Sequence, residues 1–255
     1  VDIASQKASG SHYKHPVFRG NATLVPSEAD INQIARVLND SENVTILAGA
    51  GCKKAREEVL ALSEMLKAPI VHTLRSSDII HNDDKNVVGL TGLIGNPSGY
   101  HAVMKADVLL MLGTDFPYSN FLPENATVIQ VDKRVENIGN RIKVDIGVQG
   151  NCLATLQKLN QKIVPKENSE FLDGLVSNFQ KWKKQKAESS SLENDEEPLH
   201  PQLFMSALNR KASQDACFTV DVGESAIWVA HHLTLSGNRR LLGSFNHGSM
   251  AVGFP

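Results

Sequence analysis

The sequence lacks several features that mark large classes of protein, and each absence narrows what the chain can do. Its 3 cysteines are widely spaced and odd in number, and no CxxC pair occurs, so neither a disulfide framework nor a paired-thiol metal site is predicted. This usage fits a reducing, cytoplasmic compartment. None of the 9 histidines has zinc-ligand spacing. No apolar run approaches the roughly 20 residues that span a bilayer.

The chain also has no large excess of positive or negative charge, and it has few aromatic residues. The formal net charge is -2, so no basic field attracts nucleic acid or an anionic lipid surface. Aromatic residues make up 5% of the chain, too few for a platform that stacks single-stranded bases. Hydrophobic residues reach 41% and charged residues 21%, which is ordinary globular usage, and the length allows two domains.

Short aliphatic and β-branched runs alternate with amphipathic stretches. Ser27 and Asp30 have capping-box spacing at the start of the first such stretch. The alternation predicts an α/β fold, a doubly wound parallel sheet with helices on both faces, followed by a second α/β domain. We expect strands at residues 44–48, 70–72, 108–112, 127–132 and 144–146, and helices at about 28–39, 52–67, 97–105 and 151–162.

Composition also predicts the domain boundaries. The parts are a connector at 1–25, a central domain at 26–164, a helix and acidic linker at 165–198, and a truncated second domain at 199–255 with strands near 218–221 and 241–243. Because the chain begins with Val1 and closes on a small apolar run, we expect a piece of a longer polypeptide. The alternative is tag removal together with a genuine short C-terminus.

A glycine-rich turn, Gly49-Ala50-Gly51, separates the first expected strand from the next helix. Backbone amides in such a turn can approach an anion, and the helix N-terminus favours negative charge. The turn lacks both the full GxGxxG pattern and the Lys-Ser/Thr of a P-loop. A tight turn that only packs helix on strand is an equally good interpretation.

Three further segments fall at the carboxyl ends of expected strands or beside them. The loop at residues 91–99 carries three glycines, which permit close backbone contact with a flat ligand. The segment 113–118 offers a hydroxyl and two aromatic rings, and Asp132 ends a strand where a carboxylate often accepts ribose hydroxyls. Together they predict a nucleotide cofactor site without choosing FAD over NAD.

A last loop, residues 246–250, contains Gly248, Ser249 and Met250 after a short expected strand. Small residues expose backbone hydrogen-bonding groups, and methionine can pack against an apolar ring. His247 is a candidate base, although a loop histidine without a role is the simpler interpretation.

Four of these stretches, in this order, resemble the pyruvate oxidases, also called pyruvate dehydrogenase (quinone), a family of thiamine-diphosphate-dependent flavoenzymes. The stretches are residues 68–75, 91–95, 112–118 and 240–251, of which the last is the most specific. The resemblance implies that 26–164 is an FAD-binding domain and that 199–255 begins the domain that binds thiamine diphosphate. It implies FAD contacts at Thr91, Gly92, Leu93, Ile94, Thr114, Asp115, Phe116, Pro117, Tyr118 and Asp132, and thiamine-diphosphate contacts at Gly248, Ser249 and Met250.

The resemblance also implies a reaction and partners. Pyruvate is decarboxylated and oxidised to acetate and CO₂ through thiamine diphosphate and FAD, and a quinone takes the electrons. It implies a homotetramer, with peripheral membrane contact through a region not present here. The Mg²⁺-diphosphate motif and the activating glutamate lie outside these residues, so we expect this chain alone to be inactive.

Other interpretations stay open. An acetolactate synthase holds FAD in its middle domain without reducing it in the main reaction, and an oxidase that forms acetyl phosphate with O₂ is a second option. Two alternatives come from other functional classes: a plain nucleotide-binding module, and a regulatory or assembly domain. The regulatory or assembly domain would be recognised as a folded protein that binds no flavin.

Overall fold

The computed structural model describes residues 22–188 and 199–245, together with Gly248 and Met250. Its centre is a six-stranded parallel sheet in the order β3-β2-β1-β4-β5-β6. The predicted α/β fold with a doubly wound sheet is therefore confirmed. The strands are β1 (Val44–Ala48), β2 (Ile70–His72), β3 (Val87–Leu90), β4 (Val108–Leu112), β5 (Thr127–Asp132) and β6 (Ile146–Gln149).

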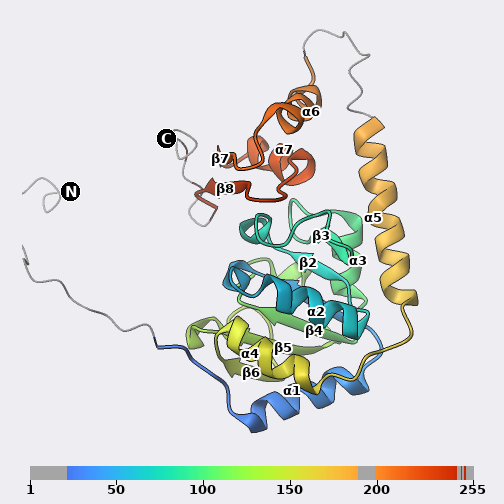
Figure 1. Ribbon diagram of the computed structural model, residues 1–255, viewed down its shortest axis with the longest axis vertical. Coiled ribbons are helices and arrows are strands. Elements are labelled where there is room, and N and C mark those ends of the chain that lie inside the picture. Colours follow the sequence, from blue (N-terminus) through green and yellow to red (C-terminus); the bar gives the residue numbers. More distant parts are fainter. Residues whose placement is uncertain (1–21, 189–198, 246–247, 249, 251–255) are drawn as a thin grey trace, which may run out of the picture.

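Different helices cover the two faces of the sheet (Figure 1). One face carries α1 (Glu28–Asp40), α2 (Arg56–Leu66) and α4 (Cys152–Leu159), and the other carries α3 (Pro97–Met104) and α5 (Glu170–Glu188). Successive strand residues point to opposite faces, so Ile46 and Leu110 join the first core while Leu47 and Leu109 join the second. Because both faces are buried, the central strands are continuous apolar runs in the sequence.

Two helix starts show how local chemistry sets the boundaries. The capping box is confirmed, since Ser27 Oγ accepts from the Asp30 amide and the Asp30 carboxylate accepts from the Ser27 amide, both at 3.2 Å. The helix predicted at 52–67 begins later than expected. A 3-10 turn follows β1 first, because the Gly51 amide bonds to the neighbouring strand's exit, and α2 starts only at Arg56.

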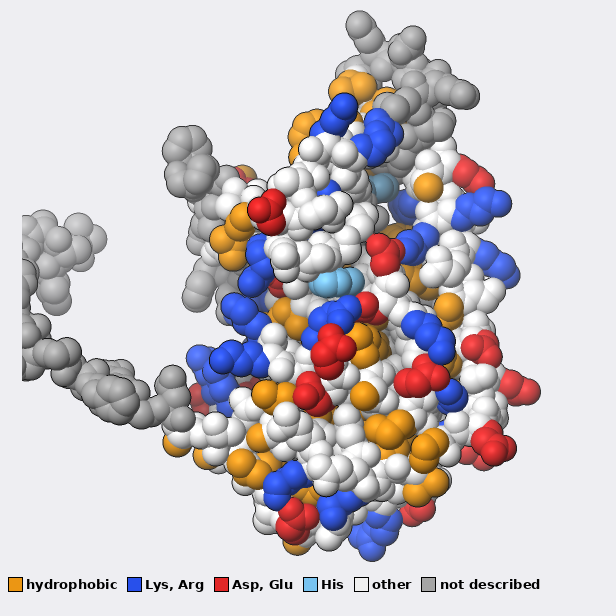
Figure 2. Space-filling view, viewed as in Figure 1, with side chains coloured by type: hydrophobic (Ala, Val, Ile, Leu, Met, Phe, Trp, Pro, Cys, Tyr) orange, Lys and Arg blue, Asp and Glu red, His pale blue; other side chains and the backbone are white. Residues whose placement is uncertain are grey.

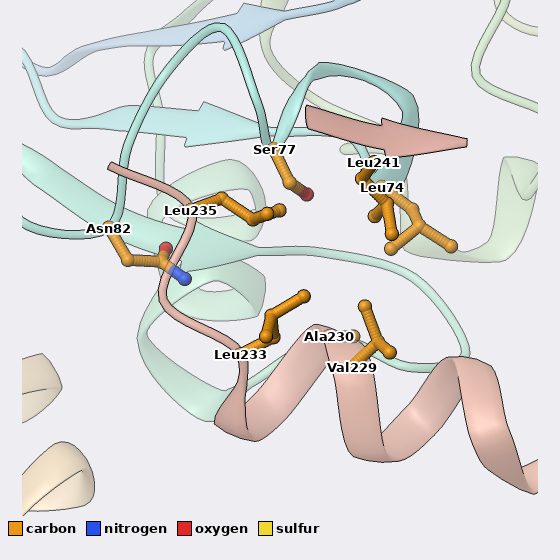
Figure 3. A pocket seen from close by; sticks show the side chains of 8 residues that line it. All are labelled: Leu74, Ser77, Asn82, Val229, Ala230, Leu233, Leu235 and Leu241. Carbon is orange, nitrogen blue, oxygen red and sulfur yellow. The ribbon is translucent and has the colours of Figure 1, made fainter. Parts of the chain in front are cut away.

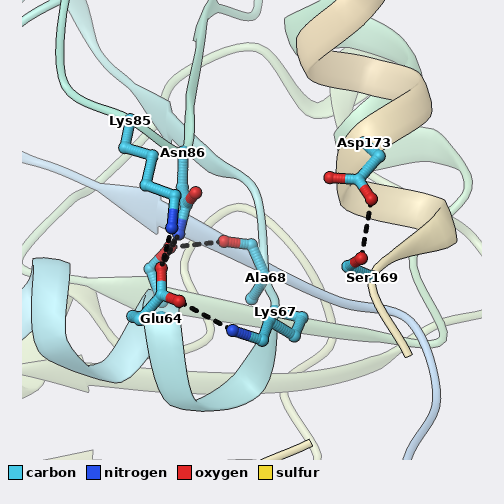
Figure 4. A network of polar contacts seen from close by, with 8 residues as sticks. Glu64, Lys67, Ala68, Lys85, Asn86, Ser169 and Asp173 are labelled. Carbon is cyan, nitrogen blue, oxygen red and sulfur yellow. Dashed lines mark hydrogen bonds and ion pairs between the residues drawn. The ribbon is translucent and has the colours of Figure 1, made fainter. Parts of the chain in front are cut away.

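One strand was not predicted and another is displaced. β3 is short and contains Gly89 at φ +90°, so its sequence carries little strand signal. A buried network holds it in place (Figure 4): Asn86 Nδ2 donates to Ser63 Oγ at 3.0 Å, and Ser63 Oγ donates to the Ala68 carbonyl at 2.6 Å. The strand predicted at 144–146 lies instead at Ile146–Gln149, where its residues alternate between buried and exposed.

The second unit lies at one end of the molecule, beside the C-terminal end of α5 (Figure 1). It contains α6 (Pro201–Lys211), β7 (Cys217–Val220), α7 (Glu224–His232) and β8 (Arg240–Gly243), and its two strands pair in parallel. α5 is more than a connector, because Leu175 and Phe179 are buried in the second core of the central sheet.

Among the helices of the described residues, none combines the length and the apolar character that crossing a membrane requires.

Candidate functional site

The carboxyl ends of the parallel strands form the edge of the sheet on which the sequence predicts a ligand. The strand order reverses between β1 and β4, and open α/β sheets bind ligands at such a switch point. Exposed Lys53 and Lys54 follow β1 at this edge, and exposed Lys133 and Arg134 follow β5. Basic side chains gather on the left of Figure 2, the side to which these carboxyl ends point. This local charge favours an anionic ligand.

The glycine turn after β1 packs directly on the exit of β4. The Gly49 amide donates to the Leu112 carbonyl and the Gly51 amide donates to the Gly113 carbonyl, each at 2.9 Å. A Cβ on Gly51 would lie 2.6 Å from Gly113 Cα, so only glycine allows the two backbones to approach. Because both glycine amides are used within the protein, the structure supports the tight-turn interpretation of this segment rather than the anion cradle.

The β3–α3 loop, residues 91–96, carries an unsatisfied polar group. The Thr91 side chain is 4% exposed, and its hydroxyl has no hydrogen-bond partner among the described residues. Ser98, in the first turn of α3, is in the same state. A buried polar group without a partner destabilises the protein by roughly 1–3 kcal/mol. Such hydroxyls are therefore candidates for contact with a bound polar group.

The structure brings this loop against the segment that follows β4. A Cβ on Gly92, which has φ +100°, would lie 3.1 Å from both Phe116 Cζ and Tyr118 Cδ2. The Phe116 and Tyr118 rings meet edge to face with their centroids 5.5 Å apart. Leu93 is 69% exposed and Tyr118 is 40% exposed, so the joint surface of the two loops is apolar and open.

Two aromatic residues that the sequence did not single out extend this surface. Phe121 lies edge to face with Tyr118 at 6.3 Å and with Tyr100 at 6.1 Å between ring centroids. Tyr100 lies on α3 and Phe121 in a 3-10 turn after β4, so their meeting follows from the fold and has no local signal in the sequence. Together with Leu93 and Tyr118, they form what we call the aromatic surface, and Phe116, which is only 4% exposed, supports it through its contact with Tyr118.

Asp132, which ends β5, is buried and already accepts two hydrogen bonds. Its carboxylate takes the Arg134 amide at 2.8 Å and the Asn137 side-chain amide at 3.1 Å. A carboxylate has about four acceptor positions, so it can still accept ribose hydroxyls. Gln130, whose side-chain amide bonds the Thr114 carbonyl at 3.1 Å and the Asn137 carbonyl at 3.1 Å, ties the two strand exits together.

The carboxylate of Asp115 already accepts hydrogen bonds within the protein, which leaves fewer acceptor positions for a ligand than the sequence alone indicated. Its two carboxylate oxygens accept from Arg141 Nε at 3.1 Å and Arg141 Nη2 at 3.4 Å, and Asn140 adds a bond at 3.3 Å. The β5–β6 loop therefore folds over the exit of β4 and forms one wall of the site. Pro117 is exposed on the same segment, and Thr114 is buried beneath it.

The residues fit a flavin dinucleotide, the cofactor that the family resemblance implies. The unpaired Thr91 hydroxyl offers a partner for a polar chain, and the aromatic surface suits a flat ring system. Asp132 ends a strand at the position typical of ribose contacts. When bound, FAD would supply a two-electron acceptor at this edge. No group of three or more metal-ligating side chains occurs in the described ranges.

The loop implied to hold thiamine diphosphate is only partly described. Gly248 has φ +63° and its amide donates to the Ser244 carbonyl at 3.0 Å, while the Met250 side chain is 65% exposed. Ser249 and His247 lie outside the described residues.

The second unit contacts the β3–α3 loop through α7. Since a carbonyl can only accept, His231 Nε2 carries a proton and donates it to the Ile94 carbonyl at 3.0 Å. The ring of Trp182 on α5 meets the His231 ring at 90° with 5.4 Å between centroids. Burial lowers the pKa of His231, and burial followed by nearby Lys186 lowers the pKa of neighbouring His232 to about 4.

These histidines predict that acid weakens the folded state. The pKa of an unfolded histidine is about 6.5, so between that pH and about 4 the unfolded chain binds a proton that folded His232 does not. The contribution of neutral His232 to the unfolding free energy is therefore present in full above pH 6.5, and it decreases as the pH drops through this window. Allowing for partial exposure, we expect His232 to account for about 1 kcal/mol of lost unfolding free energy at pH 5.

Urea denaturation at pH 7 and pH 5 measures this effect, with His232→Phe as the variant. The phenylalanine ring keeps the packing on Trp228 and removes the titration. Because His72 and His231 also have pKa values lowered by burial, part of the acid loss should remain in the variant. An acid loss as large in the variant as in the parent chain contradicts the role of His232.

Comparison with known proteins places this site within a family. Residues 31–159, half of the chain, match the thiamine pyrophosphate enzyme central domain. The chain is 33% identical over 248 residues to the putative thiamine pyrophosphate-containing protein YdaP of Bacillus subtilis, covering 95% of this chain and 42% of that protein. It is 26% identical over 252 residues to a pyruvate oxidase of Lactiplantibacillus plantarum, covering 97% and 40%.

A probable acetolactate synthase large subunit of Methanocaldococcus jannaschii is 29% identical over 242 residues, covering 88% of this chain and 40% of that protein. The chain thus spans about two fifths of the length of the curated relatives that it matches. The match covers Thr91, Thr114 and Asp132 alike. The chain therefore belongs to the thiamine pyrophosphate enzymes and carries their central domain.

Proposed function

We propose that the central domain of this chain binds FAD along the carboxyl edge of its sheet. The observation that carries the proposal is the buried, unpaired hydroxyl of Thr91 beside the open aromatic surface. We assign FAD contacts to Thr91, Gly92, Leu93 and Ile94 in one loop, to Thr114, Asp115, Phe116, Pro117 and Tyr118 in the other, and to Asp132.

We further propose that the intact enzyme is a pyruvate oxidase of the quinone-reducing kind. It converts pyruvate to acetate and CO₂ with thiamine diphosphate, Mg²⁺ and FAD, with Gly248, Ser249 and Met250 contacting thiamine diphosphate. The sequence run 240–251 supports this choice, and one relative is named a pyruvate oxidase. The proposal includes a cytoplasmic homotetramer that contacts the membrane peripherally through a region outside this chain.

A second candidate is an acetolactate synthase, in which FAD is not reduced in the main reaction. A relative named a probable acetolactate synthase large subunit is 29% identical to this chain, so similarity favours this reaction as much as oxidation. The two candidates share the FAD site and differ in whether pyruvate reduces the flavin.

Visible absorption after gel filtration with added FAD tests the cofactor, on both this chain and the intact enzyme. A flavin band that elutes with this chain supports a site within it. A band only with the intact enzyme places part of the site on other domains or subunits. No flavin with either protein refutes the flavoenzyme proposal. Anaerobic pyruvate, with thiamine diphosphate and Mg²⁺, then separates the two reactions, because bleaching of the flavin band indicates an oxidase and its persistence a synthase.

A further inference from the structure

The β3–α3 loop has two backbone hydrogen bonds of its own in the part of the chain that the structure describes. Within the loop, the Gly95 amide donates to the Gly92 carbonyl at 2.9 Å and the Asn96 amide donates to the Leu90 carbonyl at 3.0 Å. The first of these bonds closes a turn over Leu93 and Ile94, and the second joins the end of the loop to β3. The outer residue Leu93 is 69% exposed, and the preceding Gly92 has φ +100°, a conformation that residues with side chains rarely adopt.

The outer part of the loop is also held from the second unit. His231 on α7 donates its Nε2 proton to the Ile94 carbonyl at 3.0 Å, across 137 positions of sequence. The direction of this bond depends on the ring plane, which the perpendicular Trp182 ring restrains from α5. Trp182 in turn stacks on Phe179, which is buried in the core of the central sheet. The donor is therefore oriented by residues of both units.

The position of α7 relative to the loop is fixed by the contact between the two units, which we call the seam. Figure 3 shows Leu74 and Ser77, from the segment after β2, facing Leu233 and Leu241 of the second unit. The cavity between them measures about 10 Å³, room for about one water molecule. Leu74 also packs against the apolar core of the second unit, so movement of that unit along the seam would expose apolar surface.

A polar anchor stabilises the same seam beside its apolar contacts. The side chain of Asp78 is 6% exposed and accepts from Arg240 Nε at 2.6 Å and from the Leu241 amide at 3.3 Å. A buried carboxylate with two donors specifies one geometry, because any displacement leaves it without partners. The seam and this anchor together hold α7 where His231 reaches the loop.

We infer that His231 is a positioning residue for the proposed cofactor loop: docking of the second unit orders residues 91–95 through the His231–Ile94 hydrogen bond. The inference rests on the proposed FAD site. It adds that the site in the central domain depends on a residue of the following unit. Its consequence is that flavin affinity and loop order change together when the donor is removed.

Three variants distinguish the effect of the His231 N–H donor from the effect of its aromatic ring. His231→Phe keeps a flat ring against Trp182 and removes the donor, whereas His231→Gln restores an N–H donor of similar reach. His232→Phe is the matched control, because phenylalanine keeps a ring beside Trp228 and beside His231, and among the described residues no bond runs from the His232 ring to the loop. Thermal unfolding of all three reports whether each variant folds.

Hydrogen exchange of the peptide that covers residues 90–96 tests loop order without any flavin. We expect His231→Phe to raise its exchange roughly threefold to tenfold, the effect of losing one hydrogen bond, with His231→Gln and His232→Phe close to the parent chain. Unchanged exchange in His231→Phe overturns the inference. Equal exchange increases across the β4 peptide, or in His232→Phe, also overturn it, because they indicate general loosening rather than positioning.

FAD titration by fluorescence supplies the second measurement. His231→Phe should weaken FAD binding roughly threefold to tenfold, and His231→Gln should recover most of that loss. If neither the parent chain nor the intact enzyme binds flavin, the proposed cofactor fails, but the exchange result still decides whether His231 orders the loop. If flavin binds and His231→Phe binds it as tightly as the parent, the positioning role is wrong while the FAD proposal stands.

Discussion

Replacing Gly113 by alanine is expected to destabilise the protein by about 2–5 kcal/mol, from left-handed backbone strain together with overpacking. Gly113 has φ +57°, and a Cβ there would lie 2.5 Å from Gly51 Cα and 2.9 Å from the Gly51 carbonyl carbon. These neighbours are backbone atoms, which cannot turn away as a flexible side chain can. Urea denaturation of the purified variant, followed by far-UV circular dichroism, measures the change in unfolding free energy.

Two other glycines separate the causes. Gly139 also has a positive φ, +76°, but nothing lies within 4 Å of a Cβ built there, so Gly139→Ala reports backbone strain alone at about 1–2 kcal/mol. Gly174 lies within α5 with open space around it, so Gly174→Ala should stabilise the helix by up to about 1 kcal/mol. If Gly113→Ala costs no more than Gly139→Ala, the close approach at the switch point is not a source of stability.

The same contact explains why the glycine turn after β1 was ambiguous in the sequence. An anion cradle and a tight turn both require glycine, and the two interpretations differ only in what the amides contact. That partner, the exit of β4, is about 60 residues away along the chain. No local pattern contains this information, so the choice depends on the strand order, which the structure supplies.

Prediction of the sheet from the sequence succeeded where strands are buried on both faces. The runs at 44–48 and 108–112 are mainly aliphatic and the run at 127–132 is mainly β-branched, and the structure places β1, β4 and β5 at those bounds. It failed for β3, where Gly89 interrupts a four-residue strand, and it displaced the edge strand β6. In both cases pairing with a neighbour, rather than intrinsic preference, determines the strand.

The candidate site shows the same division. The sequence predicted the segments 91–94 and 114–118, and the structure brings them together through Gly92 against Phe116 and Tyr118. No sequence pattern indicated Tyr100 or His231. Tyr100 contacts these loops from α3 and His231 contacts them from the second unit, so both contacts depend on the tertiary fold. Residues at strand ends can be predicted from topology, whereas residues that support them depend on tertiary packing.

Substituting Asp132 by asparagine is expected to weaken FAD binding roughly 10-fold to 100-fold, while leaving the fold intact. Hydrogen bonds to a charged acceptor contribute about 1.5–3 kcal/mol, which corresponds to that range of affinity. Asparagine keeps one carbonyl oxygen for the Arg134 amide, so the turn after β5 can be retained. FAD titration of the purified variant measures the dissociation constant.

Two controls test whether the carboxylate acts on the ligand or only on its own loop. Asn137→Ala removes the donor to the second Asp132 oxygen and leaves the charge in place, so it should change FAD affinity much less than Asp132→Asn. Asp145→Asn makes the same chemical change near the opposite end of the sheet, where the carboxylate accepts from the Val128 amide and from no other group of the described residues, and should leave affinity unchanged.

The comparison between Asn137→Ala and Asp132→Asn is decisive for the assignment. If both variants weaken FAD equally, Asp132 acts by shaping the β5–β6 loop, and the ribose contact belongs to another group on that loop. If neither variant weakens FAD, the cofactor does not reach the end of β5. The proposed site is then confined to the β3–α3 loop and the aromatic surface. Only a loss specific to Asp132→Asn supports a ligand that spans the edge from β3 to β5, as an extended dinucleotide must.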